Sequence, residues 1–172
     1  MRLSVTLDLP TDAHAAARLL ADPDYVHQKV RASGALEQHV DITGSPDEAF
    51  TVTTRRALPT DQIPAHLRSL VGTRIDVRQV EAWEAPEPDG SRVGTVVVEI
   101  AGAPVRLSGR TALAPAAAGS TTVTYDGELR ASVPLFGSAI EQAAAGAIRS
   151  ALEVEQDVAV RWITGHGQAP QP

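Results

Sequence analysis

The chain has 172 residues, of which 43% are hydrophobic, 21% charged and only 3% aromatic, and its net charge is −6. These values are typical of one soluble globular domain whose core consists of Val, Leu, Ile and Ala side chains. The negative charge argues against a nucleic-acid partner, and the absence of Cys excludes a disulfide scaffold, a zinc-thiolate site and a thiol nucleophile. With no leader-like segment and no apolar run of about 20 residues, we expect a cytoplasmic protein without integral membrane association.

The first part of the chain predicts one strand followed by two short helices. Residues 2–9 alternate hydrophobic and polar side chains, which is the pattern of a half-buried strand. A proline ends this strand, and Thr11 is expected to cap the first helix. Asp22 is expected to cap the second helix, with Pro23 at its first position. Gly34 is expected to end this helix.

From residue 36 onward the hydrophobic period changes to two, which is the period of strands. Six further strands are expected, and short turns join most of them, which indicates an antiparallel meander. Residues 59–72 interrupt this pattern and include a short helical segment at 64–70. The expected strands lie at 36–42, 50–58, 75–83, 96–100, 105–113 and 123–129.

A long helix is expected at residues 138–163. Ser138 and Glu141 form the S-x-x-E pattern of a capping box. At about 1.5 Å per residue, this helix is on the order of 39 Å long and can cross a small sheet. Its first half is rich in Ala and contains Gly146, so it either approaches the sheet closely or leaves a void. Residues 165–172 lack periodicity and are expected to form a disordered tail.

Four segments resemble an uncharacterised bacterial family of the START-like helix-grip superfamily, also called the polyketide-cyclase or SRPBCC superfamily. They are LADPDYV at 20–26, TVTTRRALP at 51–59, EAWE at 81–84 and DGELRASVP at 126–134. The resemblance implies an α+β helix-grip domain over residues 1–164. In this fold a seven-stranded antiparallel sheet curves around the C-terminal helix, two short helices follow the first strand, and a cavity lies between sheet and helix. Members include lipid carriers, hormone receptors, cyclases and co-chaperones, so the fold alone does not determine the function.

Motifs of known chemistry are absent from the sequence. There is no G-x-S-x-G elbow, no H-E-x-x-H or other metal-ligand spacing, and no glycine-rich phosphate loop between a strand and a helix. The five histidines are predicted to lie at the surface. We therefore expect no metal and no cofactor, and we assign no catalytic residue.

Polar residues nevertheless occur in phase with the hydrophobic residues of several expected strands. If those strands face a cavity, the polar groups face it too and orient a ligand there. A β-bulge would instead turn them to water, and a buried ion pair between Arg56 and Glu81 is an alternative structural role. The expected cavity has a volume of ~300–1,000 Å³. The predicted ligand-binding residues are Phe50, Val52, Thr54, Arg56, Ile75, Val77, Gln79, Glu81, Trp83, Thr111, Tyr125, Phe136, Ile140, Ala144 and Ile148.

The sequence favours a non-enzymatic protein that binds or carries a small to medium-sized hydrophobic molecule, such as a lipid or a polyketide-like metabolite. A first alternative is an enzyme of the cyclase or dehydratase type, in which Arg56, Glu81 or Tyr125 handles protons. The lack of an acid–base constellation argues against it. A second alternative is an adaptor with a filled cavity, which binds a protein partner through apolar loops at residues 63–71 and 133–136. These loops either gate the cavity or pack on each other.

Overall fold

The computed structural model describes residues 1–61 and 63–166 and confirms the expected order of one strand, two short helices, six strands and one long helix. The strands are β1 (Arg2–Leu9), β2 (Glu37–Gly44), β3 (Phe50–Pro59), β4 (Arg74–Trp83), β5 (Arg92–Ile100), β6 (Val105–Pro115) and β7 (Thr121–Ala131). The helices are α1 (Ala13–Leu20), α2 (Pro23–Ala32), α3 (Ala65–Val71) and α4 (Gly137–His166), with a short 3-10 turn at Ala117–Gly119. Because α4 continues to His166, the expected disordered tail falls mainly on residues 167–172, which lie outside the described residues.

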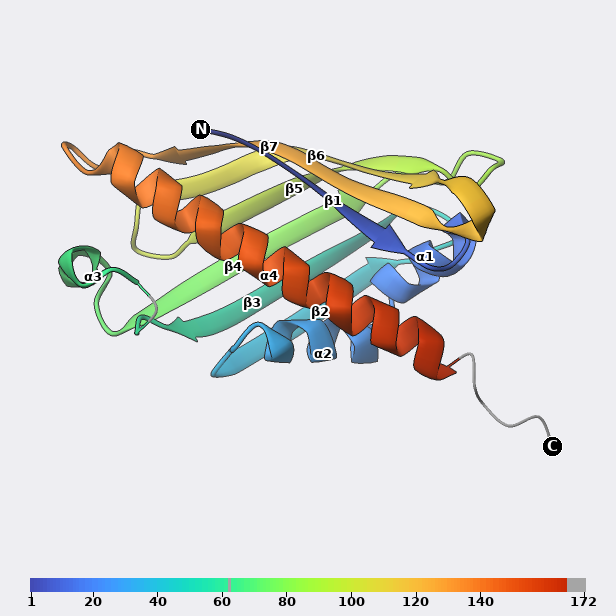
Figure 1. Cartoon of the computed structure of the whole chain (residues 1–172), viewed down its shortest axis with the longest axis horizontal. Coiled ribbons are helices and arrows are strands. Elements are labelled where there is room, and N and C mark those ends of the chain that lie inside the picture. Colours follow the sequence, from blue (N-terminus) through green and yellow to red (C-terminus); the bar gives the residue numbers. More distant parts are fainter. Residues whose placement is uncertain (62, 167–172) are drawn as a thin grey trace.

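The seven strands form one antiparallel sheet in the order β1-β7-β6-β5-β4-β3-β2. Figure 1 shows α4 crossing one face of this curved sheet, from the end near α3 to the end near α1 and α2. A single covering helix over a seven-stranded antiparallel sheet is the START-like helix-grip fold that the resemblance implies.

Regular strand pairing decides which side chains face α4. β3 and β4 pair without a bulge from Phe50, which lies opposite Trp83, to Pro59, which lies opposite Arg74. Both Phe50 and Trp83 are 2% exposed, so their side of the sheet is the covered side. Because side chains alternate between the two faces, the residues in phase with these two lie on the face that α4 covers, as the sequence predicts.

The two short helices α1 and α2 lie near the C-terminal end of α4, and α2 packs against α4 (Figure 1). Asp12, rather than the predicted Thr11, caps α1, because its carboxylate accepts the backbone N–H of Ala15. Asp22 caps α2 as predicted. Gly34 follows α2 with a φ of 85°, a conformation that favours glycine.

The start of α4 differs from the predicted capping box. The helix begins at Gly137, and Ser138 is exposed. Glu141 instead faces β7, where its carboxylate accepts the backbone N–H of Ala131 at 3.0 Å and lies 3.3 Å from the terminal ammonium of Met1. The hydrogen bond from Ala131, and then the ammonium, hold the pKa of Glu141 below its ordinary value. A tertiary contact therefore occupies the carboxylate that the local cap would have used.

Two further interpretations of the sequence are wrong. Leu36 precedes β2 instead of belonging to it, and its side chain is 65% exposed. Gly146 is exposed on α4, and a Cβ placed there would meet no atom within 4 Å. The missing side chain of Gly146 therefore serves neither a close approach to the sheet nor a void beneath the helix.

Candidate functional site

A cavity of about 60 Å³ lies between the sheet and α4. Both layers contribute to its hydrophobic walls. The main hydrophobic residues on it are Leu3, Val5, Val96, Val98, Leu107, Ile148 and Leu152. Its long polar side chains are Lys29, Arg56, Gln79, Tyr125 and Glu155. A small, largely hydrophobic space is thus bordered by several titratable groups.

The cavity is much smaller than the sequence-based expectation. Its volume of about 60 Å³ corresponds to about two water molecules at ~30 Å³ each, whereas ligand pockets typically have ~300–1,000 Å³. The predicted volume is therefore wrong. The reason is that long polar side chains from α2, α4 and the sheet extend into the space between the layers.

Lys29 in α2 connects carboxylates from two other elements. Its Nζ lies 2.7 Å from Oε1 of Glu155 in α4 and 3.9 Å from Oε1 of Glu81 in β4, and all three residues are buried. Burial by itself lowers the pKa of Lys29, but the charges of Glu155 and Glu81 outweigh burial, so the net shift is upward. Lys29 is therefore a buried cation that joins both helices to the sheet.

The polar network continues along the sheet through Gln79. Its Nε2 donates to Glu81 at 2.6 Å, and its Oε1 accepts from Arg56 at 3.1 Å. The ion pair between Arg56 and Glu81 that the sequence left open as an alternative does not form, because Arg56 lies opposite Val77, four residues along β4 from Glu81. The hydroxyl of Tyr125 donates to the other oxygen of Glu81 at 3.3 Å.

Glu81 is fully engaged by these neighbours, and Tyr125 stays protonated. One oxygen of Glu81 accepts from Gln79 and faces Lys29, while the other accepts from Tyr125. Burial and then the charge of Glu81 raise the pKa of Tyr125 well above its ordinary 10.0. At neutral pH the tyrosine is therefore a proton donor on the cavity wall, and the glutamate is its hydrogen-bond acceptor.

Arg56 is the charged group with the fewest partners in the network. Within the described residues it makes no ion pair; its guanidinium bonds to neutral Gln79, and its Nε is buried without a hydrogen-bond partner. Burial lowers its pKa, although the charges of Glu155 and Glu81 oppose that shift. Other buried polar atoms of the described residues that have no partner lie on the same face of the sheet, namely Gln38 Oε1, Thr54 Oγ1, Trp83 Nε1, Arg92 Nε and Thr111 Oγ1. Of the residues that carry such atoms, Arg56 alone lines the cavity.

The structure brings some of the predicted ligand-binding residues to the cavity and leaves others beside it. Arg56, Gln79, Tyr125 and Ile148 line the cavity, and Glu81 contacts two of them. The residues that do not line it but are buried in the core are Phe50, Val52, Thr54, Val77, Trp83 and Thr111. Ile75, Ile140 and Ala144 are partly buried outside the cavity wall, and Phe136 is 43% exposed.

Sequence reasoning missed Lys29 and Glu155, although both carry a signal. Lys29 is the only lysine of the chain and follows the buried residues Tyr25 and Val26 by four and three positions. Glu155 follows buried Leu152 by three positions. Residues three and four apart share a helix face. A charged residue on the buried face of each helix therefore indicated a polar contact inside the domain.

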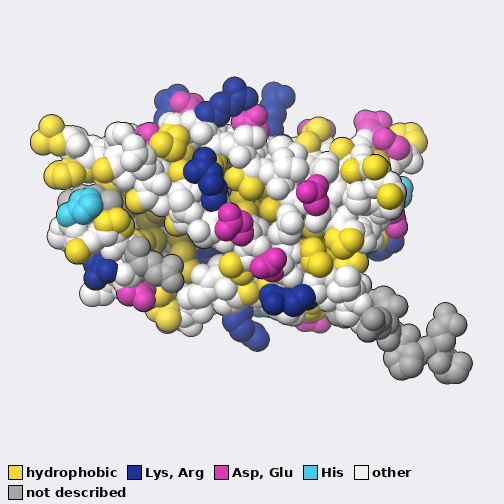
Figure 2. Space-filling model, in the orientation of Figure 1, with side chains coloured by type: hydrophobic (Ala, Val, Ile, Leu, Met, Phe, Trp, Pro, Cys, Tyr) yellow, Lys and Arg dark blue, Asp and Glu magenta, His cyan; other side chains and the backbone are white. Residues whose placement is uncertain are grey.

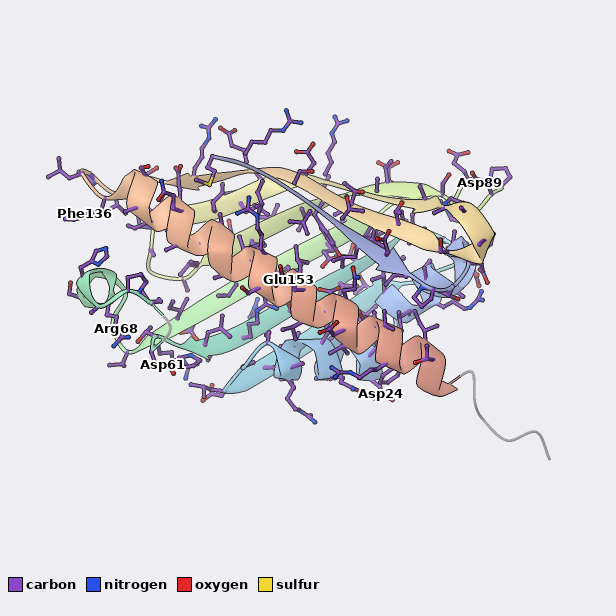
Figure 3. All side chains as sticks on the ribbon, in the orientation of Figure 1. Asp24, Asp61, Arg68, Asp89, Phe136 and Glu153 are labelled. Atoms are coloured by element: carbon purple, nitrogen blue, oxygen red, sulfur yellow. The ribbon has the colours of Figure 1, made fainter. Side chains whose placement is uncertain are left out.

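The surface beside α4 is hollowed at the end that carries α3, with hydrophobic side chains at its base (Figure 2). Figure 3 shows Phe136 at the start of α4 and Arg68 of α3 at this same end. Leu135, next to Phe136, is 99% exposed. The side chains of Leu67, Leu70 and Val71, which belong to the second expected loop, lie outside the described residues. A gating role for the two loops stays a prediction.

Two other kinds of site can be assessed for the described residues alone. Residues 1–61 and 63–166 contain no cluster of three or more His, Asp or Glu side chains that could hold a metal ion. None of the helices in this part of the chain combines the length and the hydrophobicity that a membrane span requires.

Solved structures share this fold at low sequence identity. The protein TTHA0849 from Thermus thermophilus has a TM-score of 0.60 and 13% identity, over 92% of this chain and 97% of that chain. The Zhui aromatase/cyclase from Streptomyces sp. R1128 has a TM-score of 0.57 and 13% identity, over 95% of each chain. A START superfamily protein from Mycobacterium smegmatis has a TM-score of 0.55 and 12% identity, over 94% of this chain and 98% of that chain. At these identities the likeness establishes the START-like fold and nothing about the ligand.

No curated protein matches the sequence. The family model described as "Protein of unknown function (DUF2505)" matches residues 4–163, which is nearly the whole described chain. The chain therefore belongs to the DUF2505 family, and its fold is that of the START-like superfamily.

Proposed function

We propose that this protein binds a small molecule with a hydrophobic body and an acidic group between the sheet and α4. The observation that carries the proposal is Arg56, a partly buried residue on the cavity wall whose guanidinium bonds to a neutral amide and whose buried Nε has no hydrogen-bond partner. A carboxylate or sulfonate beside it would supply the charge-assisted hydrogen bonds that the guanidinium lacks. Lys29 is shared by two carboxylates, whereas Arg56 bonds to a neutral amide, so Arg56 is the cation that we assign to the acidic group of the ligand.

The hydrophobic body of the ligand would lie toward the hollow beside α4. The first half of α4 and the edge of the cavity carry hydrophobic side chains that are only partly buried, including Val98, Ile100, Ile140 and Ala144. The cavity of about 60 Å³ accepts the acidic group alone, so the body has to cover these side chains. Covering them removes apolar surface from water and favours binding.

Two dyes with the same ring system test the charge preference. 8-Anilino-1-naphthalenesulfonate carries a sulfonate, and N-phenyl-1-naphthylamine lacks it. Arg56→Met keeps an unbranched apolar side chain and removes the charge, so sulfonate binding should weaken about 10- to 100-fold, as for a lost charged hydrogen bond. Binding of the neutral dye should stay within about threefold. Arg18→Met, on the exposed face of α1, is the matched control.

A second pair of variants tests the location. Ala151 lines the cavity, whereas Ala147 is exposed one helical turn earlier. Ala151→Leu should weaken both dyes and Ala147→Leu neither, with circular dichroism spectra and Tm measured for every variant. An unchanged ratio of the two dye affinities in Arg56→Met would refute the acidic-ligand proposal. Unchanged binding in a folded Ala151→Leu variant would place the ligand elsewhere.

An enzyme of the cyclase or dehydratase type is the second candidate. The observation that favours it is the protonated hydroxyl of Tyr125 on the cavity wall, held by Glu81. Since Glu81 is engaged on both oxygens, Tyr125 is the candidate acid. Loss of water from a β-hydroxyacyl thioester, followed by the ultraviolet absorbance of the enoyl product, tests this reading. Turnover that disappears in Tyr125→Phe with dye binding intact would favour the enzyme, and no turnover by the unmodified protein would exclude this reaction.

A further inference from the structure

The face of the sheet opposite α4, which lies behind the sheet in Figure 1, carries a row of mainly basic residues. Strand pairing aligns one residue from each of six neighbouring strands into this row, here called the arginine row. Its members, from β2 to β7, are His39, Arg55, Arg78, Glu99, Arg106 and Arg130. At about 4.8 Å between strands the row is about 24 Å long. Alternation places it on the outer face, because Thr54 next to Arg55 is buried on the inner one.

The arginine row places like charges directly opposite each other. Arg55 is paired in register with Arg78, and Arg106 with Arg130. Like charges in directly opposite positions destabilise a sheet. Two carboxylates offset part of this repulsion: Glu99 lies 3.6 Å from Arg78 and also contacts Arg106, and Glu128 lies 2.9 Å from Arg130. Within the described residues, Arg55 has no ion-pair partner, so the row retains positive charge in a chain whose net charge is −6.

The middle of the neighbouring row on the same face is uncharged. The next row of paired residues contains Thr53, Val80, Val97 and Ser108, and the two valines are only partly buried. Basic groups beside partly buried valines form a surface that matches a protein segment with acidic and hydrophobic residues.

We propose that the arginine row is a docking surface for an acidic segment of a partner protein. An extended segment on the order of seven residues long would span the row. A single-stranded nucleic acid fits this face less well than a protein segment does. None of the six aromatic residues of the chain lies on this face, so it offers no platform for stacking bases. The proposal is independent of the ligand site beneath α4.

The test uses a fluorescein-labelled octaglutamate peptide and fluorescence anisotropy at low ionic strength. We expect the unmodified protein to bind it with an affinity that falls as salt rises. Arg55→Gln/Arg78→Gln should weaken binding about tenfold, which corresponds to about 1.4 kcal/mol. Arg18→Gln/Arg149→Gln removes the same charge from exposed positions on α1 and α4 and should change the affinity less than about threefold. The melting temperature of each variant verifies folding.

Several results would overturn the proposal. The proposal is refuted if the unmodified protein does not bind octaglutamate. It is also refuted if the two double variants lose the same amount of octaglutamate affinity. Tighter binding of a labelled thymidine octanucleotide, with the same dependence on Arg55 and Arg78, would assign the surface to nucleic acid. Self-association that disappears in Arg55→Gln/Arg78→Gln, measured by sedimentation, would assign it to a second copy of the chain.

Discussion

Lys29→Met is expected to be strongly destabilising, because it removes one cation from the buried network. Glu81 and Glu155 would remain buried with Arg56 as the one balancing charge among the network residues. Breaking a buried pair by removing one partner typically costs about 3–5 kcal/mol. For a chain of this length 1 kcal/mol corresponds to a Tm change of about 2–4 °C, so the Tm should fall by roughly 6–20 °C.

Partner substitutions separate the charge effect from a packing effect. Glu155→Gln keeps Lys29 near Glu81, so it should cost only about 1–3 kcal/mol. Lys29→Met/Glu155→Leu removes one charge of each sign and leaves Arg56 balanced by Glu81. The double variant should therefore be more stable than Lys29→Met alone. The free energy of unfolding is measured by urea denaturation at pH 7, with circular dichroism as the readout.

The pH dependence gives an independent check of the same reasoning. The pKa of Lys29 in the folded protein lies above its ordinary 10.5. Its stabilising contribution is therefore complete below pH 10.5 and is lost only as the pH rises through the higher folded value. The stability difference between unmodified protein and Lys29→Met should stay constant from neutral pH to about pH 10. A loss of less than about 1 kcal/mol in the free energy of unfolding of Lys29→Met would refute a buried, paired cation. So would a double variant no more stable than Lys29→Met, or a stability difference that already declines near neutral pH.

Three other substitutions test separate parts of the fold. Gly146→Ala should stabilise the protein by about 1 kcal/mol, because this exposed helix position has free space; an unchanged Tm would contradict this. Gly109→Ala should destabilise it by about 1–3 kcal/mol, because a Cβ there would lie 2.3 Å from the carbonyl oxygen of Asp126; an unchanged urea midpoint would show that β6 and β7 separate easily. Glu141→Gln should lower the urea midpoint at pH 7. Because the pKa of Glu141 in the folded protein lies below 4.5, its stabilising contribution is present above pH 4.5 and is lost as the pH falls through the folded value. The urea midpoints of Glu141→Gln and the unmodified protein should therefore converge in acid; midpoints that remain apart would contradict this.

Local sequence pattern determined the fold and the inward face of the strands. Alternation placed Arg56, Gln79 and Tyr125 on the covered side of the sheet, and uninterrupted pairing preserved that side. Alternation also placed Arg55 on the outer face. Caps were less well determined, because a capping residue is chosen among neighbouring acceptors: Asp12 rather than Thr11 caps α1. Such features are local, since a residue's position in a period of two or 3.6 depends only on its near neighbours.

Only the tertiary structure decided which polar groups meet. Lys29 and Glu155 are 126 residues apart, and they touch because α2 and α4 pack against each other. The carboxylate of Glu141 accepts the backbone N–H of Ala131 instead of capping its own helix. The side chain of Gln79, and not that of Glu81, bonds to Arg56. The volume of the cavity was decided in the same way. The volume depends on the distance between α4 and the sheet and on the rotation of α4 about its axis. All the side chains between the two layers determine this distance and rotation together, so a local pattern in the sequence cannot predict them.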